Sequence, residues 1–267
     1  ELYLIIYMLL RFRLRHVALG AVLKFVAPVV LMLMLPTVMQ AQIGDHRNDL
    51  SIGFSGGYVM SNVGFTPKVT QDSHTGITLG LSMRYTCEKY FNTICSIAAE
   101  VNYARIGWKE SILTTDDQPV INPTTGIAEA YQRDLDYIQV PIFAHLAWGR
   151  EQKGMQFFFK AGPQFGYLIS VKTKTNFSYD NRNTADRSNQ TAEQYNMPVE
   201  NKFDYGIAAG MGVEYSYPKV GHFLLEGRYY YGLGNIYGDS KRDYFAKSNH
   251  SNIVVKLTYL FDVIRSK

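Results

Sequence analysis

Hydrophobic residues alternate with small or polar residues along almost the whole chain after about residue 48. Because successive side chains of a β-strand point to opposite faces, a period of two residues predicts strands. The first run extends from Leu50 to Met60, where the larger apolar side chains are separated by serines and glycines. Seven further runs have the same period, at residues 77–85, 97–103, 138–148, 157–169, 203–215, 223–231 and 253–261. The pattern therefore predicts eight strands.

The connections between these runs are alternately short and long. The short ones lie at residues 88–91, 149–154 and 218–221, and the long ones at 61–74, 110–130, 172–202 and 235–250. Short turns on one side and long polar loops on the other are typical of outer-membrane barrels, with periplasmic turns and extracellular loops. An even number of strands also places both termini in the periplasm.

Alternation alone does not say whether the apolar face meets lipid or a soluble core of the lipocalin kind. The less hydrophobic face is rich in Gly, Ala and Ser with about one charge per strand, whereas a water-facing surface should carry many Lys, Glu and Thr. Tyr, Phe and Trp recur near the strand ends, as in the aromatic girdles of membrane barrels. The sequence thus predicts an all-β protein: an eight-stranded antiparallel transmembrane up-and-down β-barrel in the outer membrane, in contact with membrane lipid and lipopolysaccharide.

A set of charged residues occupies the same alternate strand positions as the small residues, so these charges should lie in the lumen. It comprises Arg84, Glu100, Lys160, Glu214, Glu226, Arg228 and Lys256. An uncompensated charge in a narrow lumen would be costly, so we expect these residues to pair across it, with Asp204 as a further balancing carboxylate. A gated ion path is the alternative function for the same residues. Eight strands leave an interior that side chains can fill, so no polypeptide could pass through it.

The N-terminal 41 residues have a different pattern. A basic segment containing Arg11, Arg13 and Arg15 precedes an apolar stretch from Phe25 to Met39. This order predicts a cleavable signal peptide in residues 1–41, with a possible upstream-translated extension, followed by the barrel in residues 42–267. A retained membrane anchor is the alternative, and Lys24 and two prolines argue against it.

The composition and the search for motifs mainly exclude classes of function. The chain has 20 Tyr and 22 Gly, and its formal charge of +4 forms no basic stripe for nucleic acid. The six histidines are scattered, and we find no metal-ligand spacing, nucleophile elbow or phosphate-binding loop. Glu100, Glu214 and Glu226 could form an acid–base set, but salt bridges are the better interpretation. We therefore expect a non-enzymatic protein without catalytic residues, cofactor or metal.

The two cysteines lie on either side of the first short turn. Cys87 and Cys95 are placed symmetrically about Phe91, and both occupy the alternate strand positions that carry the apolar side chains. Directly opposed positions of a hairpin could bring the two sulfurs within bonding distance, and exported proteins keep disulfides. The alternatives are one structural disulfide or two free, lipid-facing thiols.

Four segments resemble motifs of the PorT-like family of outer-membrane barrels. They are residues 135–142 (LDYIQVPI), 159–168 (FKAGPQFGYL), 204–215 (DYGIAAGMGVEY) and 228–236 (RYYYGLGNI). The resemblance covers about residues 49–262 and implies an eight-stranded barrel without enzymatic activity. The namesake of the family is needed for export of proteinases by the type IX secretion system.

The resemblance implies an accessory role in that secretion, in contact with other outer-membrane secretion components. Because the lumen is narrow, such a protein would act beside the conduit, through its outer wall or its long loops. Two other functions remain open: a surface-exposed binding or adhesion barrel, and a narrow small-solute channel.

Overall fold

The computed structural model describes residues 45–265 apart from 152, 186, 190, 196 and 239–242, and the predicted signal peptide lies outside this range. Residues 44–267 form one compact unit. Its long strands are β1 (Asp45–Thr66), β3 (His74–Tyr90), β4 (Thr93–Glu110), β5 (Tyr131–Gly149), β6 (Gly154–Thr175), β7 (Phe203–Tyr217), β8 (Gly221–Gly232) and β9 (Lys247–Ile264). Three short elements complete it: β2 (Gln71–Asp72) and the 3-10 turns η1 (Tyr179–Asn181) and η2 (Glu193–Tyr195).

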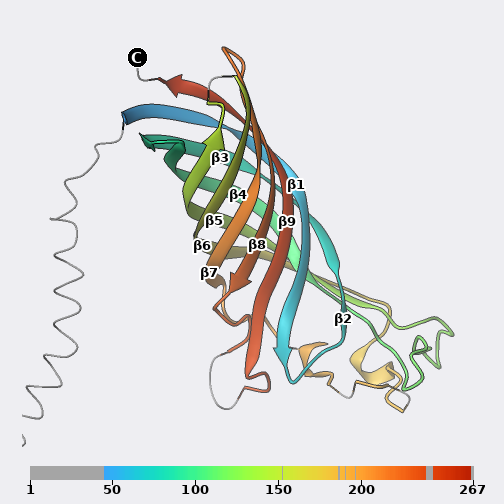
Figure 1. Cartoon of the computed structure of the whole chain (residues 1–267). Helices are drawn as coiled ribbons and strands as arrows, with labels where there is room; N and C mark the ends of the chain where they lie inside the picture. Colours follow the sequence, from blue (N-terminus) through green and yellow to red (C-terminus); the bar gives the residue numbers. More distant parts are fainter. Residues whose placement is uncertain are drawn as a thin grey trace, which may run out of the picture. The chain divides into compact units, whose positions relative to one another are not determined.

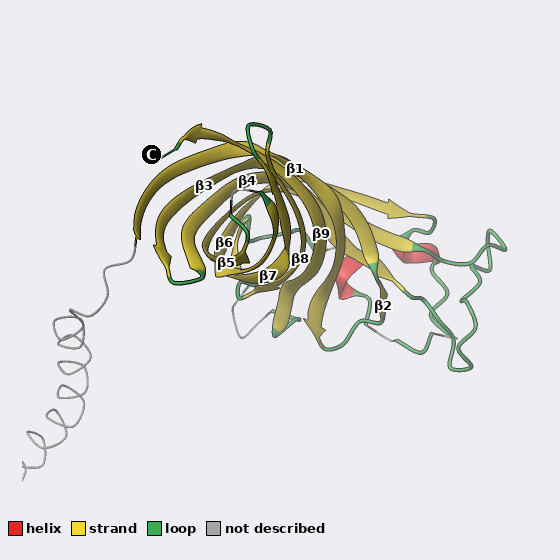
Figure 2. Ribbon diagram, turned by 45° about the horizontal axis from the view of Figure 1, so that its top comes forward, coloured by secondary structure: helices red, strands yellow, loops and turns green. Residues whose placement is uncertain are grey.

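The long strands form a closed ring. Each pairs antiparallel with the strands before and after it, and β1 pairs with β9 to close the ring. The two-residue strand β2 pairs with the end of β4 and belongs to the first long connection. Figures 1 and 2 show the ring from two directions. The predicted eight-stranded antiparallel up-and-down barrel is therefore confirmed.

The barrel has two different ends. Three short connections, residues 91–92, 150–153 and 218–220, lie at the end where β1 begins and β9 finishes, which we call the turn end. The long connections, residues 67–73, 111–130, 176–202 and 233–246, lie at the opposite end, which we call the loop end.

Several strands extend further toward the loop end than the hydrophobic pattern predicts. Residues 61–66 and 172–175 were expected in loops, but they continue β1 and β6. In β6 this extension reads Lys-Thr-Lys-Thr, so it has strand geometry without apolar alternation. A hydrophobic period marks only the part of a strand that has an apolar surface on one side.

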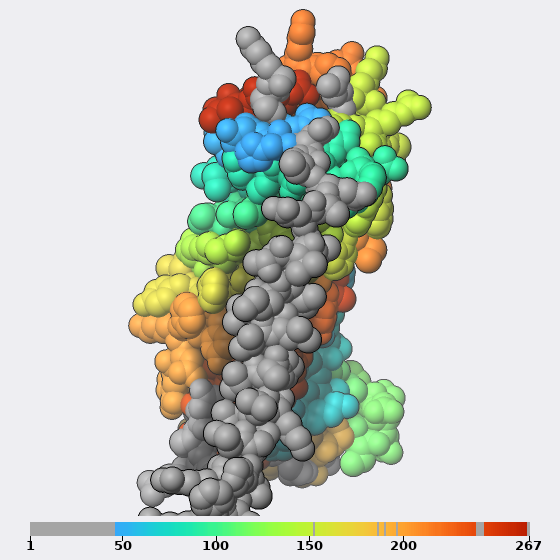
Figure 3. All heavy atoms as spheres, turned by 60° about the vertical axis from the view of Figure 1, so that its left-hand side comes forward, coloured from blue at the N-terminus to red at the C-terminus, as the bar shows by residue number. Residues whose placement is uncertain are grey.

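The outer face of the ring is apolar over its middle. The exposed side chains there include Ile52, Phe54, Leu79, Leu81, Ile97, Val101, Ile142, Phe165, Met211, Leu225 and Leu257. Figure 3 shows side chains of successive strands crossing the wall as oblique coloured bands. An apolar band around the outside of a closed barrel indicates contact with lipid. In the described residues no helix is long and apolar enough to cross a membrane.

Of the two alternatives left open for Cys87 and Cys95, the structure has the free thiols. A register shift between Thr86 and Glu88 places Cys95 opposite Glu88 instead of Cys87. A bulge inserts one extra residue into one strand, so symmetric spacing about the turn does not make the two cysteines directly opposed.

Candidate functional site

The middle of the barrel holds a compact group of five charges, which we call the central cluster: Glu100, Lys160, Glu226, Arg228 and Lys256. Glu100 accepts hydrogen bonds from Lys160 Nζ at 2.9 Å, Lys256 Nζ at 2.6 Å and Arg228 Nη2 at 2.8 and 2.9 Å. Glu226 contacts Lys160 Nζ at 2.5 Å and an Arg228 nitrogen at 2.6 Å. All five side chains are at most 5% exposed.

The other two predicted lumen charges form a separate pair nearer the turn end. Arg84 Nη1 lies 2.5 Å from Glu214 Oε2. Glu214 also lies 2.8 Å from His222 Nδ1, and the other ring nitrogen of His222 lies 3.1 Å from Asp262. Ser51 donates to Asp262 at 2.7 Å, so these contacts join β7, β8, β9 and β1. We call Ser51, Glu214, His222 and Asp262 the seam clasp, because they span the β1–β9 junction.

Phe143 completes the filling of the lumen, and we did not single it out from the sequence. Its ring is 1% exposed, with Arg228 Cζ at 4.6 Å and Lys160 Nζ at 4.8 Å from its centroid. Cations over an aromatic face are attracted by the ring quadrupole. Phe143 lies on the same face of its strand as Gln139 and His145, because even numbers of positions separate the three residues. This alternation could have placed Phe143 in the lumen. The centre of the barrel is thus packed with side chains.

Asp204 lies outside the central cluster. It accepts a hydrogen bond from the hydroxyl of Tyr230 at 2.7 Å, closer to the loop end. Tyr137 and His250 lie near it, with the Tyr137 hydroxyl 3.3 Å from His250 Nε2. The carboxylate therefore belongs to a second polar group and does not balance the central cations directly.

The loop half of the barrel is filled by an aromatic core. Phe65 packs edge-on against Trp108 at 5.3 Å between ring centroids, and its ring is tilted against that of Phe245 at 4.9 Å. Tyr237 stacks on Phe245 at 5.6 Å, so residues of the last long connection fold into the barrel. The polar centre and this core together close the interior along its length.

The lipid-facing surface ends before the loop end does. On β4 the exposed Val101 is followed by Tyr103 and Arg105, and Arg105 Nε lies 2.8 Å from Asp136 on β5. The hydroxyl of Tyr103 donates to the same carboxylate at 2.7 Å. A charged pair with a tyrosine marks the polar boundary of a membrane barrel. The last residues of β4, up to Glu110, therefore lie outside the membrane.

Two long connections, residues 111–130 and 176–202, form an ordered structure that we call the cap. The buried Glu129 pairs with Arg187, which also donates to the Tyr195 hydroxyl at 2.7 Å. Tyr195 in turn donates to Glu110 at 2.7 Å, and Gln194 donates to Glu110 at 3.1 Å. Burial raises the pKa of Glu110 to about 7, although these hydrogen bonds act in the opposite direction. Burial likewise raises the pKa of Tyr195.

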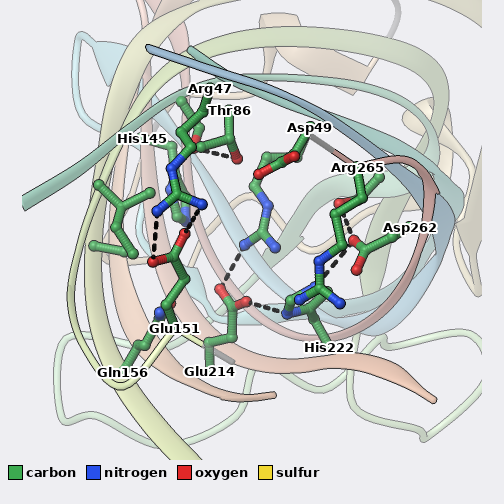
Figure 4. Close-up of a pocket in the computed structure, with 15 residues that line it drawn as sticks. Arg47, Asp49, Thr86, His145, Glu151, Gln156, Glu214, His222, Asp262 and Arg265 are labelled. Carbon is green, nitrogen blue, oxygen red and sulfur yellow. Dashed lines mark hydrogen bonds and ion pairs between the residues drawn. The ribbon is translucent and has the colours of Figure 1, made fainter. Parts of the chain in front are cut away.

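A polar cavity of about 80 Å³ opens at the turn end, and we call it the vestibule (Figure 4). Its floor includes Arg84 and His145, and its walls include Gln156, Glu151 and the seam clasp. Arg47 and Lys89 reach Glu151 near its mouth, at 3.4 and 3.1 Å. In the figure the labelled side chains come from several strands and from the turn that holds Glu151, and they point toward one shared space.

One contact set has the residue types of a nucleophilic triad. Ser61 Oγ lies 3.2 Å from His74 Nδ1, and His74 Nε2 lies 2.8 Å from Asp134. All three residues are at most 2% exposed, and the Ser61 hydroxyl is also held by both backbone groups of Gly107. A nucleophile must reach its substrate, so this arrangement stabilises the wall. No group of three or more His, Cys, Asp and Glu suited to a metal occurs among the described residues.

Comparison with known proteins gives a family. The family model described as outer membrane protein beta-barrel domain matches residues 40–238. No curated protein matches the chain in sequence.

Several solved structures are similar over most of their length. The outer membrane protein OprG from Pseudomonas aeruginosa is 14% identical with a TM-score of 0.38, over 82% of this chain and 98% of that one. Ail from Yersinia pestis, solved with the heparin analogue sucrose octasulfate, is 14% identical with a TM-score of 0.35, over 80% and 99%. Neisserial surface protein A is 11% identical with a TM-score of 0.35, over 79% and 97%.

Proposed function

Because this chain belongs to the family of outer membrane protein β-barrel domains, we propose that it is a closed barrel that acts by binding a partner protein at its loop end. In this proposal the loop end faces the outside of the cell, and the turn end and both termini face the periplasm. This orientation follows the rule that membrane barrels have short periplasmic turns and long external loops.

The observation that carries the proposal is the filled interior. The central cluster and Phe143 occupy the middle of the lumen, and the aromatic core around Trp108 occupies its loop half. Conduction of a solute would require these side chains to leave a packed and charge-paired arrangement, which is costly. Binding at the surface requires no such change.

The cap provides a suitable surface. Ile121 and Ile127 are 49% and 62% exposed, and they lie on the two arms of a small hairpin in the 111–130 connection. The exposed Tyr179 lies on the neighbouring 176–202 connection, and Asn122 of the hairpin donates to the backbone oxygen of Asn181 at 2.8 Å. We call Ile121, Ile127 and Tyr179 the cap tip. Apolar side chains held on an ordered polar support are typical of protein-binding surfaces.

Protein secretion is the specific form of this function that the resemblance to the PorT-like family favours. The barrel would then be a non-enzymatic accessory of type IX secretion that contacts other outer-membrane components beside the conduit. Adhesion to an external ligand through the same cap tip is the second form. Both forms require the cap tip, and only the first requires secretion partners.

The test is complementation of a deletion strain, combined with isolation of cross-linked partners. The wild-type protein should restore export of proteinases and yield one reproducible partner. The double substitution Ile121→Ser with Ile127→Ser should abolish both results while the barrel remains in the outer membrane in equal amount. Tyr244→Ser is the matched control, because Tyr244 is similarly exposed at the loop end but lies outside the cap.

Three results would count against the proposal. Normal export in the deletion strain would remove the secretion form. Retention of the partner by the Ile121/Ile127 variant would contradict the cap tip as the binding surface. Steady conductance of the wild-type barrel in planar bilayers would favour a small-solute channel and overturn the closed-barrel proposal.

A further inference from the structure

The floor of the vestibule contains buried polar atoms without a hydrogen-bond partner. In the central cluster each carboxylate meets at least two cationic side chains. At the floor of the vestibule His145 is 2% exposed, yet neither of its ring nitrogens has a hydrogen-bond partner among the described residues. The same holds for Nε of Arg84. A buried polar atom without a partner costs about 1–3 kcal/mol, so such atoms in a native protein usually meet water or a ligand.

The carboxylates around the vestibule do not supply these missing partners, because each is already engaged. Glu214 is held by Arg84 and His222, and Asp262 by His222 and Ser51. Glu151 is held by Arg47 and Lys89, and Asp49 also has a partner. The unused capacity at the floor therefore consists mainly of donors: Arg84 Nε–H and one N–H of His145.

The position of His145 limits the ligand further. Its ring stacks on Phe158 with 5.0 Å between centroids, which fixes the direction of its nitrogens. A neutral imidazole donates one hydrogen bond and accepts one. A ligand that satisfies both nitrogens and the guanidinium must therefore present acceptor oxygens and at least one O–H donor.

We propose that the vestibule is a binding site for a small protonated oxyanion, phosphate in particular, held by Arg84 and His145. Phosphate keeps at least one O–H at neutral pH, while its other oxygens accept from the guanidinium and the imidazole. Sulfate has no O–H at this pH and leaves one His145 nitrogen without a partner. The cavity of about 80 Å³ has room for roughly two or three water molecules at ~30 Å³ each, and phosphate occupies a similar space.

The mouth of the cavity is suited to the entry of an anion. Arg47 and the exposed Arg265 line it, while the engaged carboxylates of Glu151 and Asp262 lie beside them. Gln156 lines the same cavity and is 5% exposed. It is placed to supply an additional amide donor. The site is independent of the cap, because the two lie at opposite ends of the barrel.

The experiment is calorimetric titration, at pH 7, of the barrel purified from membranes in detergent, with phosphate, sulfate and chloride. We expect saturable binding of phosphate, weaker binding of sulfate and no saturable binding of chloride. His145→Phe keeps a ring on Phe158 but removes both nitrogens, and it should weaken phosphate binding about tenfold or more, as loss of a charged hydrogen bond does. Gln156→Leu, a second variant on the same lining, should also weaken it.

Lys153→Ala is the matched control, because Lys153 is an exposed cation of the turn end that does not line the cavity. Its affinity for phosphate should equal that of the wild type. The proposal is overturned if phosphate shows no saturable binding, if sulfate binds as tightly as phosphate, or if both lining variants keep wild-type affinity. An equal loss in Lys153→Ala would likewise overturn it, because binding would then depend on general surface charge.

Discussion

Glu100 is the residue on which the charge balance of the lumen depends. Three cations from β6, β8 and β9 converge on its carboxylate. No single cation is equally central, because Glu100 keeps two cationic partners when one of the three is lost. Loss of one partner from a buried ion group leaves the remaining charges uncompensated, which costs more than the pair itself contributes. The consequences of substitution should therefore differ between the carboxylate and the cations.

We expect Glu100→Gln to lower the free energy of unfolding by about 3–5 kcal/mol, because three buried cations would then share Glu226 alone. Lys256→Met should cost clearly less, since it leaves two cations and two carboxylates in the cluster. Urea unfolding in lipid vesicles measures both values. Equal stability of Glu100→Gln and the wild type would contradict the assigned role of Glu100.

Glu110 makes the stability of the cap depend on pH. Its folded-state pKa of about 7 lies above its ordinary value of 4.5, so the folded protein binds this proton more tightly than the unfolded chain. The stability that protonation contributes is fully present below pH 4.5 and is lost as the pH rises through 7. We expect a loss of about 2 kcal/mol between pH 5.5 and 8 at ~1.4 kcal/mol per unit.

The measurement is urea unfolding of the wild type and of Glu110→Gln at both pH values. The difference between the two proteins isolates the contribution of Glu110 from that of other titrating groups. If the variant keeps the full pH dependence of the wild type, Glu110 is not its source.

The alternation of side chains along each strand predicts well which residues face the lumen, but it predicts little about the loops. Lys160 and Arg228 could be placed inside from the alternation alone, because every second residue of their strands faces the lumen. Glu129 and Arg187 lie in connections without any period, and their buried pair depends on how two loops fold together. The sequence left two alternatives open for Cys87 and Cys95, a disulfide or free thiols, because spacing about a turn does not reveal a bulge.

At the level of the elements, the middle of β7 projects little side-chain volume into the lumen. Its inward positions carry Gly206, Gly210 and Gly212, next to large inward side chains of the adjacent strands. A Cβ at Gly212 would lie 2.7 Å from Cζ of Phe158 and 2.1 Å from the backbone oxygen of Leu225. The absence of a side chain at these three positions of β7 therefore makes room for the residues that fill the lumen.

Two glycines of neighbouring strands give a matched test of this interpretation. Gly212→Ala should destabilise the barrel by about 1–3 kcal/mol, as overpacking of a core does. Gly227 faces outward on β8, and a Cβ there would meet no atom within 4 Å. Gly227→Ala should leave the stability unchanged or raise it by up to about 1 kcal/mol. Similar destabilisation of both variants in urea would show that the effect is not steric contact in the lumen.

The extent of the elements was less predictable than their number. The alternation gives eight strands and their order, because the lipid-facing surface imposes an apolar residue at every second position. Beyond Arg105 and in residues 172–175 the outer face is polar, so strand and loop look alike in the sequence. Only pairing with a neighbouring strand shows that these segments are extended.

For the whole molecule, the two tryptophans report how the barrel sits in a bilayer. Trp108 is fully buried in the aromatic core, whereas Trp148 is 36% exposed on the outer face near the turn end. Its indole N–H donates to Thr93 at 2.8 Å, as expected for an aromatic residue at the membrane interface.

Brominated lipids should therefore quench the fluorescence of Trp108→Phe, in which Trp148 is the remaining tryptophan. They should leave that of Trp148→Phe almost unchanged. Reversal of this order, or a protein that stays folded in buffer without detergent, would show that the apolar face does not meet lipid.

The central cluster also constrains how the chain enters its membrane. Glu100 and Lys256 are 156 positions apart, and they meet only when the final strand joins the first. A hairpin inserted alone would carry an orphan charge into hydrocarbon, which is expensive. The sheet must therefore close into a barrel while its lumen-facing side is still hydrated. A product truncated before its C-terminal strand leaves the edges of β1 and β8 unpaired and the polar lumen open to hydrocarbon, so the bilayer itself rejects it.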